Sequence, residues 1–329
     1  MNLNKLTVSI NSKHFANKLY KKIKRYGVVI IENVFTEDEC NNYTTDILTC
    51  FDALKSDLDI KDLSTWKDEN LPPQTRPGMF QSLVGNLPPV WKIRTHNNVQ
   101  KIFETVYSKL RGKNITNFIV SSDGINIKPV NKSPFHTNKT KDWPHIDQTY
   151  GDAYKCIQGQ AVFTNTTACF RASIKSHLIF DKILETLKIN NKSNWLKLNE
   201  NDFNIVKNIV TNKKIYWQEP IYAKKGSFII WTSSTIHSAQ YAIKNEIINN
   251  KDKYNGWRSV VYVCYRPREE FTVNEIKKRQ NIYYNNRMSN HWSTKIFAKQ
   301  PNAMYINISS FHPNIQNYIT AGSLLNDTL

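Results

Sequence analysis

The stretch RSVVYVCY, residues 258–265, is a run of β-branched and aromatic residues that begins with an arginine. Such a short apolar run is typical of a buried β-strand. Comparable runs predict further short strands at 115–121, 157–164, 221–223 and 227–231. Many short strands of this kind favour a sandwich or a barrel for the second half of the chain.

Apolar residues recur at helical spacing elsewhere, which predicts helices near residues 15–26, 37–55, 99–110, 177–188, 201–210 and 269–285. Gly27 follows the first segment, where a left-handed residue commonly ends a helix. Thr36 and Glu39 have the spacing of a capping box at the start of the second. The prolines between 58 and 95 exclude long helices and predict a packed, irregular loop. Helices followed by short strands predict an α+β protein with helices flanking its β part.

The chain shows neither an internal repeat nor a linker that would separate two domains, so we expect a single domain over residues 1–329. Its 8 Trp, 16 Tyr and 15 Phe supply a sizeable core, which excludes an intrinsically disordered chain. The expected parts are a helical N-terminal part at about 1–112, a β part at about 113–268, and a C-terminal helix and tail at about 269–329.

The charge of the chain is strongly positive. Lys and Arg number 45 and Asp and Glu number 27, which gives a net charge of +18 and favours an anionic partner. However, the excess is mostly Lys, is spread along the chain and accompanies abundant Asn and Ile, as expected of an AT-rich source such as a large DNA virus or a protist. A small-molecule substrate is therefore favoured, and nucleic acid is the alternative partner.

Cysteine usage and hydropathy indicate the compartment. The 5 cysteines are widely spaced and contain no C-x-x-C, so neither a disulfide framework nor a thiolate zinc site is indicated. No apolar stretch approaches the ~20 residues that a bilayer crossing needs, and the first thirty residues lack a signal-peptide core. We therefore expect a soluble, intracellular (cytoplasmic) protein without a membrane span.

A histidine and an aspartate lie two positions apart in the stretch WPHIDQTYG, residues 143–151. In an extended segment such residues point to the same side, so His145 and Asp147 can bind one metal ion. The spacing alone also fits a surface histidine beside an acid. His237 follows the predicted strand 227–231 and can supply a second imidazole. Two imidazoles and one carboxylate suit Fe(II) in oxygenases, whereas a zinc hydrolase uses the same ligands plus water.

Arg258 begins an otherwise apolar strand. A buried guanidinium needs an acidic partner, and its planar shape matches a carboxylate through two hydrogen bonds. The partner is either a side chain in a structural salt bridge or the carboxylate of a ligand.

The order of these residues, an H-x-D motif, a later histidine after a strand and an arginine on the next strand, resembles the phytanoyl-CoA dioxygenase family of Fe(II)/2-oxoglutarate oxygenases. Further segments that resemble the family are Ser121-Ser122-Asp123-Gly124, Trp143-Pro144-His145-Ile146-Asp147-Gln148, Ile157-Gln158-Gly159, Ser176-His177, Gly226-Ser227, residues 261–267 and His291-Trp292. Together they span about residues 12–300.

The resemblance implies a double-stranded β-helix, also called a jelly roll or cupin-like fold, with helices packed outside. It implies iron ligands at His145, Asp147 and His237, and it implies that Arg258 binds the distal carboxylate of 2-oxoglutarate. Ser238, directly after His237, is a second candidate contact of the co-substrate. Candidate substrate contacts around the mouth of the pocket are Asp123, Asn126, Lys128, Trp143 and Gln148. His177 is expected to be a cap or packing residue.

The implied activity is hydroxylation of an unidentified substrate with release of succinate and CO2, and the positive charge of the chain favours an anionic one. Fe(II), 2-oxoglutarate and O2 are the implied cofactors, with ascorbate as a stimulant. Asp147 favours hydroxylation over halogenation, because halogenating relatives lose this carboxylate. Two alternatives stay open, a non-catalytic basic jelly-roll module that binds nucleic acid or another polyanion and a zinc hydrolase with the same three ligands.

Overall fold

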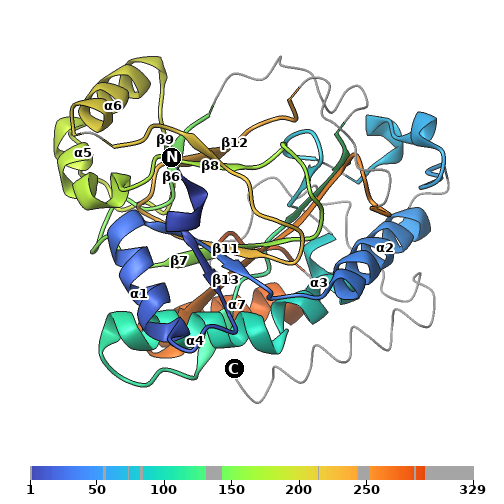
Figure 1. Ribbon diagram of the computed structural model, residues 1–329, viewed down its shortest axis with the longest axis horizontal. Helices are drawn as coiled ribbons and strands as arrows, with labels where there is room; N and C mark the ends of the chain where they lie inside the picture. Colours follow the sequence, from blue (N-terminus) through green and yellow to red (C-terminus); the bar gives the residue numbers. More distant parts are fainter. Residues whose placement is uncertain are drawn as a thin grey trace.

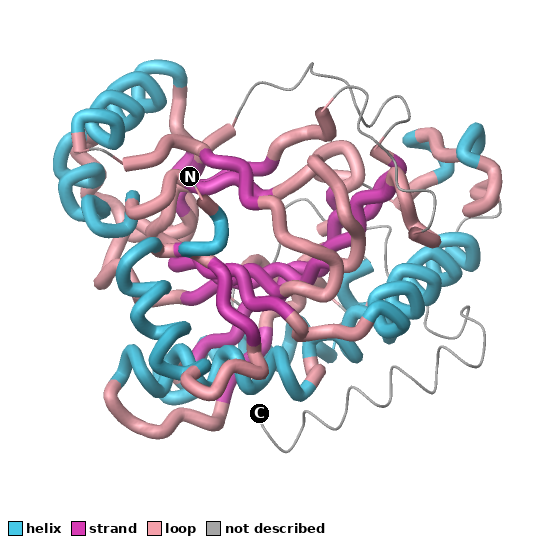
Figure 2. The backbone as a smooth tube through the Cα atoms, viewed as in Figure 1, coloured by secondary structure: helices cyan, strands magenta, loops and turns pink. Residues whose placement is uncertain are grey.

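The computed structural model of the chain has two β-sheets with helices around them (Figure 1). It describes residues 2–54, 57–72, 74–81, 84–130, 143–213, 215–243, 252–284 and 287–292. The expected tail beyond residue 292 and the expected end of the second helix at 55 lie outside these residues. Figure 2 shows the strands gathered in two layers, with the described helices outside them. The α+β expectation is confirmed.

The larger sheet has eight strands. Along the sheet the order is β1 (Thr7–Ser9), β2 (Val28–Glu32), β11 (Phe228–Thr232), β7 (Ile157–Val162), β13 (Trp257–Pro267), β5 (Ile125–Pro129) and β3 (Met79–Phe80), while β4 (Phe118–Val120) pairs with β13. β1 and β2 are parallel, and the other pairs are antiparallel. Three strands of the expected helical N-terminal part, β1, β2 and β3, therefore belong to this sheet.

The smaller sheet has five short strands in antiparallel pairs. Their order is β10 (Glu219–Ile221), β8 (Phe170–Ala172), β12 (His237–Ala239), β6 (His145–Ile146) and β9 (Leu196–Lys197). The strand predicted at 221–223 lies two residues earlier in the chain. The pairing of β6 with β12 places His145 directly opposite His237.

The α-helices of the described residues are α1 (Phe15–Tyr26), α2 (Glu37–Leu54), α3 (Pro88–Arg94), α4 (Asn97–Arg111), α5 (Phe180–Thr186), α6 (Glu200–Asn212) and α7 (Val273–Tyr284). Short 3-10 helices are η1 (Leu3–Lys5), η2 (Leu63–Thr65), η3 (Asp68–Asn70), η4 (Val84–Asn86), η5 (Ser176–Ile179) and η6 (Arg268–Glu270). The helix expected at 177–188 is thus divided between η5 and α5.

Local signals explain where several helices begin and end. The Thr36 hydroxyl accepts a hydrogen bond from the Glu39 amide at 3.2 Å, and the Glu39 carboxylate accepts one from the Thr36 amide at 2.7 Å, so the capping box before α2 is confirmed. Gly27 ends α1 with φ of 74°. The irregular loop expected over 58–95 is wrong for Pro88–Arg94, because a proline in the first helical turn sacrifices no hydrogen bond.

Strand β13 shows how the sheet divides the core. Alternate side chains, Val261, Val263 and Tyr265, pack with residues of α1, α2, α3 and α4 in the larger core cluster. Val260 and Tyr262 face the other way and pack with residues of the smaller sheet. Because successive side chains of a strand point to opposite faces, one row of β13 side chains enters the space between the sheets, where the candidate site lies.

The described residues also bear on membrane crossing and on the state of the cysteines. Among the helices of the described residues, none is both long and apolar enough to cross a bilayer. All five cysteines are buried, and none is in a disulfide.

Candidate metal centre

Three predicted ligands meet between the sheets. His145 begins β6, Asp147 follows this strand, and His237 begins β12. All three side chains are buried, and one ligand atom from each lies within 4.8 Å of the others. The Nε2 atom of His145 is 3.6 Å from Oδ1 of Asp147, and the Nε2 atom of His237 is 3.3 Å from Oδ2. The donor set is that of a two-histidine, one-carboxylate metal centre.

The other nitrogen of each imidazole faces a backbone carbonyl two residues earlier. Nδ1 of His145 lies 3.2 Å from the Trp143 oxygen, and Nδ1 of His237 lies 2.9 Å from the Thr235 oxygen. An Nδ1–H that donates to a carbonyl leaves the lone pair on Nε2, which is the form that binds a metal. Burial, reinforced by His237, lowers the pKa of His145 to about 3, so its imidazole is neutral at pH 7.

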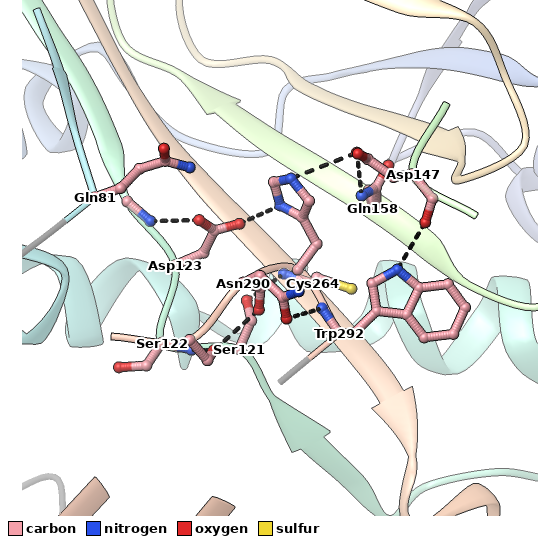
Figure 3. Close-up of polar contacts among 12 residues, drawn as sticks. Gln81, Ser121, Ser122, Asp123, Asp147, Gln158, Cys264, Asn290 and Trp292 are labelled. Carbon is pink, nitrogen blue, oxygen red and sulfur yellow. Dashed lines mark hydrogen bonds and ion pairs between the residues drawn. The ribbon is translucent and has the colours of Figure 1, made fainter. Parts of the chain in front are cut away.

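Asp147 is held at its carboxylate and at its backbone (Figure 3). Gln158 Nε2 donates to Oδ2 at 2.8 Å, and Trp292 Nε1 donates to the backbone oxygen at 2.8 Å. Burial opposes ionisation of this carboxyl, but the neighbouring His145, His291 and His237 outweigh burial and lower its pKa. The carboxylate is therefore ionised and suited to a cation.

The centre opens into a cavity of about 510 Å³ between the two sheets. Of the predicted site residues, Trp143, Ser238 and Arg258 line it together with the three ligands. The Trp143 ring stacks on the His145 ring, with centroids 4.6 Å apart. Ser238 Oγ donates to Gln218 Oε1 at 2.5 Å, so its proton points away from the ligands.

Arg258 has no acidic partner among the described residues. Its side chain is 2% exposed, and Nη1 donates to the backbone oxygen of Ala168. Nη2 is buried with no hydrogen-bond partner in the described parts of the chain, and no ion pair of those parts includes this arginine. A buried unpaired guanidinium nitrogen is costly, so this geometry suits a ligand anion.

Other polar atoms of the larger sheet are also unpaired. Among the described residues of this sheet, five more buried atoms have no hydrogen-bond partner: Asn126 Oδ1, Gln158 Oε1, Gln160 Oε1, Trp231 Nε1 and Arg266 Nε. They belong to strands β5, β7, β11 and β13, and of these residues Gln160 and Trp231 line the cavity. Since buried polar groups are normally paired, these two atoms of the cavity wall suit a polar ligand or ordered water.

Two further candidates, Asn126 and Lys128, lie on β5 beside β13 but do not line the cavity. Lys128 is opposite Arg258 in the strand register. Its amine donates to the Pro77 backbone oxygen at 3.1 Å and lies 4.8 Å from the centre of the Tyr241 ring. Burial, together with the charge of Arg258, lowers the pKa of Lys128 to about 7.

Gln148 and Asp123 lie behind the cavity wall rather than on it. Gln148 is fully buried, and its amide donates to the Asp152 oxygen at 2.7 Å, which holds the turn after Asp147. Asp123 forms an ion pair with His291. His177 lies outside the centre, where its Nε2 contacts the Lys24 backbone oxygen at 3.0 Å, in accord with a packing role.

Sequence reasoning assigned no role to two residues of the cavity wall, His291 and Arg76. His291 Nε2 is 3.4 Å from Asp147 Oδ2. Burial opposes charge on this imidazole, but Asp123 and Asp147 outweigh burial and raise its pKa to about 10. The Arg76 guanidinium lies 4.1 Å from the centre of the Trp143 ring. The only earlier signal was that His291-Trp292 resembles the oxygenase family.

No family model matches the sequence, and no curated protein is similar to it in sequence. A solved structure of a hypothetical protein from Escherichia coli has 10% identity and a TM-score of 0.58, over 96% of this chain and 85% of that one. GlcNAc Inducible Gene 2 of Candida albicans has 13% identity and a TM-score of 0.53, over 98% and 85%. The epimerase SnoN, solved with Fe3+, alpha ketoglutarate and nogalamycin RO, has 13% identity and a TM-score of 0.45, over 76% and 82%. The first two likenesses show a shared fold.

Proposed function

We propose that the protein is an Fe(II)/2-oxoglutarate-dependent dioxygenase of the phytanoyl-CoA dioxygenase type, with a double-stranded β-helix as its core. One observation carries the proposal. A buried set of two imidazoles and one carboxylate shares a cavity with Arg258, whose guanidinium has a nitrogen without a partner among the described residues. A metal ion and an organic acid can therefore be bound side by side.

The residues divide into two binding functions. His145, Asp147 and His237 would hold the iron, and Arg258 would bind the distal carboxylate of 2-oxoglutarate. Bound Fe(II) supplies the chelation of the 2-oxo acid and the activation of O2. The balanced reaction converts R–H, O2 and 2-oxoglutarate into R–OH, succinate and CO2. One oxygen atom enters the product and the other enters succinate.

Aromatic residues of both sheets shield this reaction from water. Phe170 and Trp231 line the cavity with ring centroids 4.4 Å apart, and each ring lies 5.5 Å from the His237 ring. Exclusion of water strengthens charge interactions inside the site and suppresses side reactions.

The proposed substrate is a small organic anion. Among the described residues that line the cavity, Asp147 is the one acid, whereas Arg76, Arg258 and the protonated His291 are cations. If Arg258 binds the co-substrate, Arg76 is available for a carboxylate or phosphate of the substrate. The stack of Arg76 on Trp143 and of Trp143 on His145 places this charge next to the metal ligands.

The test is an anaerobic titration of the purified protein with Fe(II) and then 2-oxoglutarate, followed through the weak visible charge-transfer band of the chelate. We expect a band in the wild type, no band in His145→Ala, and weaker 2-oxoglutarate binding in Arg258→Ala. His177→Ala is the matched control, because this buried histidine contacts a backbone carbonyl outside the centre.

Absence of a band in the iron-loaded wild type would contradict the proposal. Bound zinc after air-free purification and indifference to 2-oxoglutarate would indicate a zinc hydrolase. Binding of DNA that weakens steeply with salt and survives His145→Ala would indicate a polyanion-binding module.

A further inference from the structure

We propose that His291 is a positioning residue of the metal centre, which is fixed by Asp123 and in turn fixes the carboxylate of Asp147. This inference rests on the proposed function, because it assigns Asp147 to a metal ion. It assigns a role in the site to the segment 287–292, which supplies none of the proposed metal ligands.

The imidazole of His291 lies between two carboxylates. Its Nδ1 forms an ion pair with Oδ2 of Asp123, and its Nε2 lies 3.4 Å from Oδ2 of Asp147. A carboxylate is only an acceptor, so both contacts are attractive when both ring nitrogens carry a proton. The ring then donates to Asp123, forms an ion pair with Asp147, and so links the two acids.

Asp123 is a rigid support for this imidazole. Its side chain is fully buried, and Oδ1 accepts the Gly124 amide at 2.7 Å. Its backbone oxygen accepts a hydrogen bond from the buried Arg94. Since both ends of Asp123 are held, the position of His291 is determined by the protein rather than by a ligand.

The neighbouring residue makes a second contact with the same ligand. Trp292 Nε1 donates to the backbone oxygen of Asp147 at 2.8 Å (Figure 3). The indole is 2% exposed and stacks with Tyr150, whose ring centroid is 5.6 Å away. Residues 291 and 292 therefore hold Asp147 at its side chain and at its backbone.

The segment 287–292 is itself anchored beside Asp123. The Ser289 amide donates to the Ser122 oxygen at 2.8 Å, and the Ser122 amide donates to Ser289 Oγ at 2.8 Å. Asn86 donates to the Arg287 oxygen at 3.1 Å. These bonds tie the segment to the chain that carries Asp123, so that His291 and its acidic partner are placed together.

The consequence for the metal site concerns the two oxygens of Asp147. Gln158 and His291 both approach Oδ2, the oxygen that also lies 3.3 Å from His237 Nε2, whereas Oδ1 lies 3.6 Å from His145 Nε2. A carboxylate that binds through one oxygen leaves more coordination positions open for co-substrate and O2. His291 is not part of the set of ligand atoms within 4.8 Å, so it acts through Asp147.

The experiment measures Co(II) affinity and the Co(II) absorption spectrum of the full chain, without 2-oxoglutarate. We expect His291→Ala to weaken Co(II) binding about 10- to 100-fold and to alter the spectrum, as loss of a residue that orients a ligand does. We expect Asp123→Asn, which removes the charge that holds the imidazole, to weaken binding several-fold. His177→Ala is expected to leave both readouts unchanged.

The unfolding temperature of each metal-free variant separates positioning from folding. His291→Gln, which keeps an N–H donor, is the second variant if the alanine variant does not fold, and we expect intermediate affinity. The inference would be overturned if folded His291→Ala kept the wild-type Co(II) affinity and spectrum, or if both His291→Gln and Asp123→Asn kept them. Either outcome would leave the proposed function intact. A wild type that binds no Co(II) would instead overturn the proposed function.

Discussion

Individual hydrogen bonds distinguish residues that look alike in the sequence. Gln158 and Gln160 both lie on β7 and face the space between the sheets. Of these two glutamines, only Gln158 donates to the Asp147 carboxylate among the hydrogen bonds of the described residues. The two glutamines therefore form a matched pair for testing how Asp147 is held.

We expect Gln158→Ala to weaken Co(II) binding by about tenfold, because a ligand carboxylate that loses a hydrogen bond is less well oriented. Gln160→Ala is expected to stay within about twofold of the wild type. The measurement is an absorption titration with Co(II). Equal affinities of the two variants would show that the bond at 2.8 Å does not orient the ligand.

Lys128 gives a prediction for pH. Burial and then Arg258 lower its pKa to about 7 from the usual 10.5, so between these values the unfolded chain binds more protons than the folded chain. The free energy of unfolding then rises with pH from about 7 to 10, by at most about 1.4 kcal/mol per unit from this group. Lys128→Met is expected to be more stable than the wild type near pH 7, with the difference shrinking toward pH 10. Urea denaturation at several pH values measures this, and parallel pH profiles of the two proteins would contradict it.

Some helices and strands can be predicted from their own sequence pattern, and others cannot. The long periodic segments α1, α2, α4, β11 and β13 were predicted, because each carries enough apolar residues to reveal its period. Strands β6 and β12 have two and three residues, too few to show an alternation, and they are strands because they pair with each other. Of the proposed metal ligands, His145 and Asp147 are indicated by their spacing, and His237 by its place after a predicted strand and by the family resemblance. His291 and Gln158 reach Asp147 only through the fold.

The end of α1 allows a prediction about one glycine. A Cβ on Gly27 would clash with His177 Nδ1 and would lie 2.7 Å from Thr235 Oγ1, and φ is 74°. Gly112, after α4, has φ of 67° and nothing within 4 Å of such a Cβ. We expect Gly112→Ala to cost about 1 kcal/mol of unfolding free energy and Gly27→Ala about 2–4 kcal/mol, because crowding adds to backbone strain.

Denaturant unfolding of both glycine variants measures this difference. Since the Thr235 carbonyl faces His237, Gly27→Ala should also weaken Co(II) binding, whereas Gly112→Ala should not. Equal losses of stability would show that His177 and Thr235 move aside without cost.

At the scale of the molecule, the cavity joins two layers that are otherwise separate sheets. The proposed metal ligands belong to the smaller sheet and the turn after β6, and Arg258 belongs to the larger one. A metal with 2-oxoglutarate would therefore connect the layers and stabilise the fold.

We expect Fe(II) alone to raise the unfolding temperature, and Fe(II) with 2-oxoglutarate to raise it further, under anaerobic conditions. A ligand at one hundred times its Kd stabilises by about 2.7 kcal/mol. In Arg258→Ala, Fe(II) alone should raise the unfolding temperature as much as in the wild type. The further rise on addition of 2-oxoglutarate should be smaller than in the wild type. Thermal unfolding measures both shifts, and an undiminished second shift in this variant would remove Arg258 from the co-substrate site.

The segment 287–292 also has a consequence for the order of assembly. The bond between Asp147 and Trp292 spans 145 residues, and the ion pair of Asp123 with His291 spans 168. During synthesis all three proposed ligands leave the ribosome well before this segment does. Such distant contacts form late in folding, since long loops must close first. Tight metal binding would then mark completion of the native topology, and newly made chains would acquire iron only at the end of their maturation.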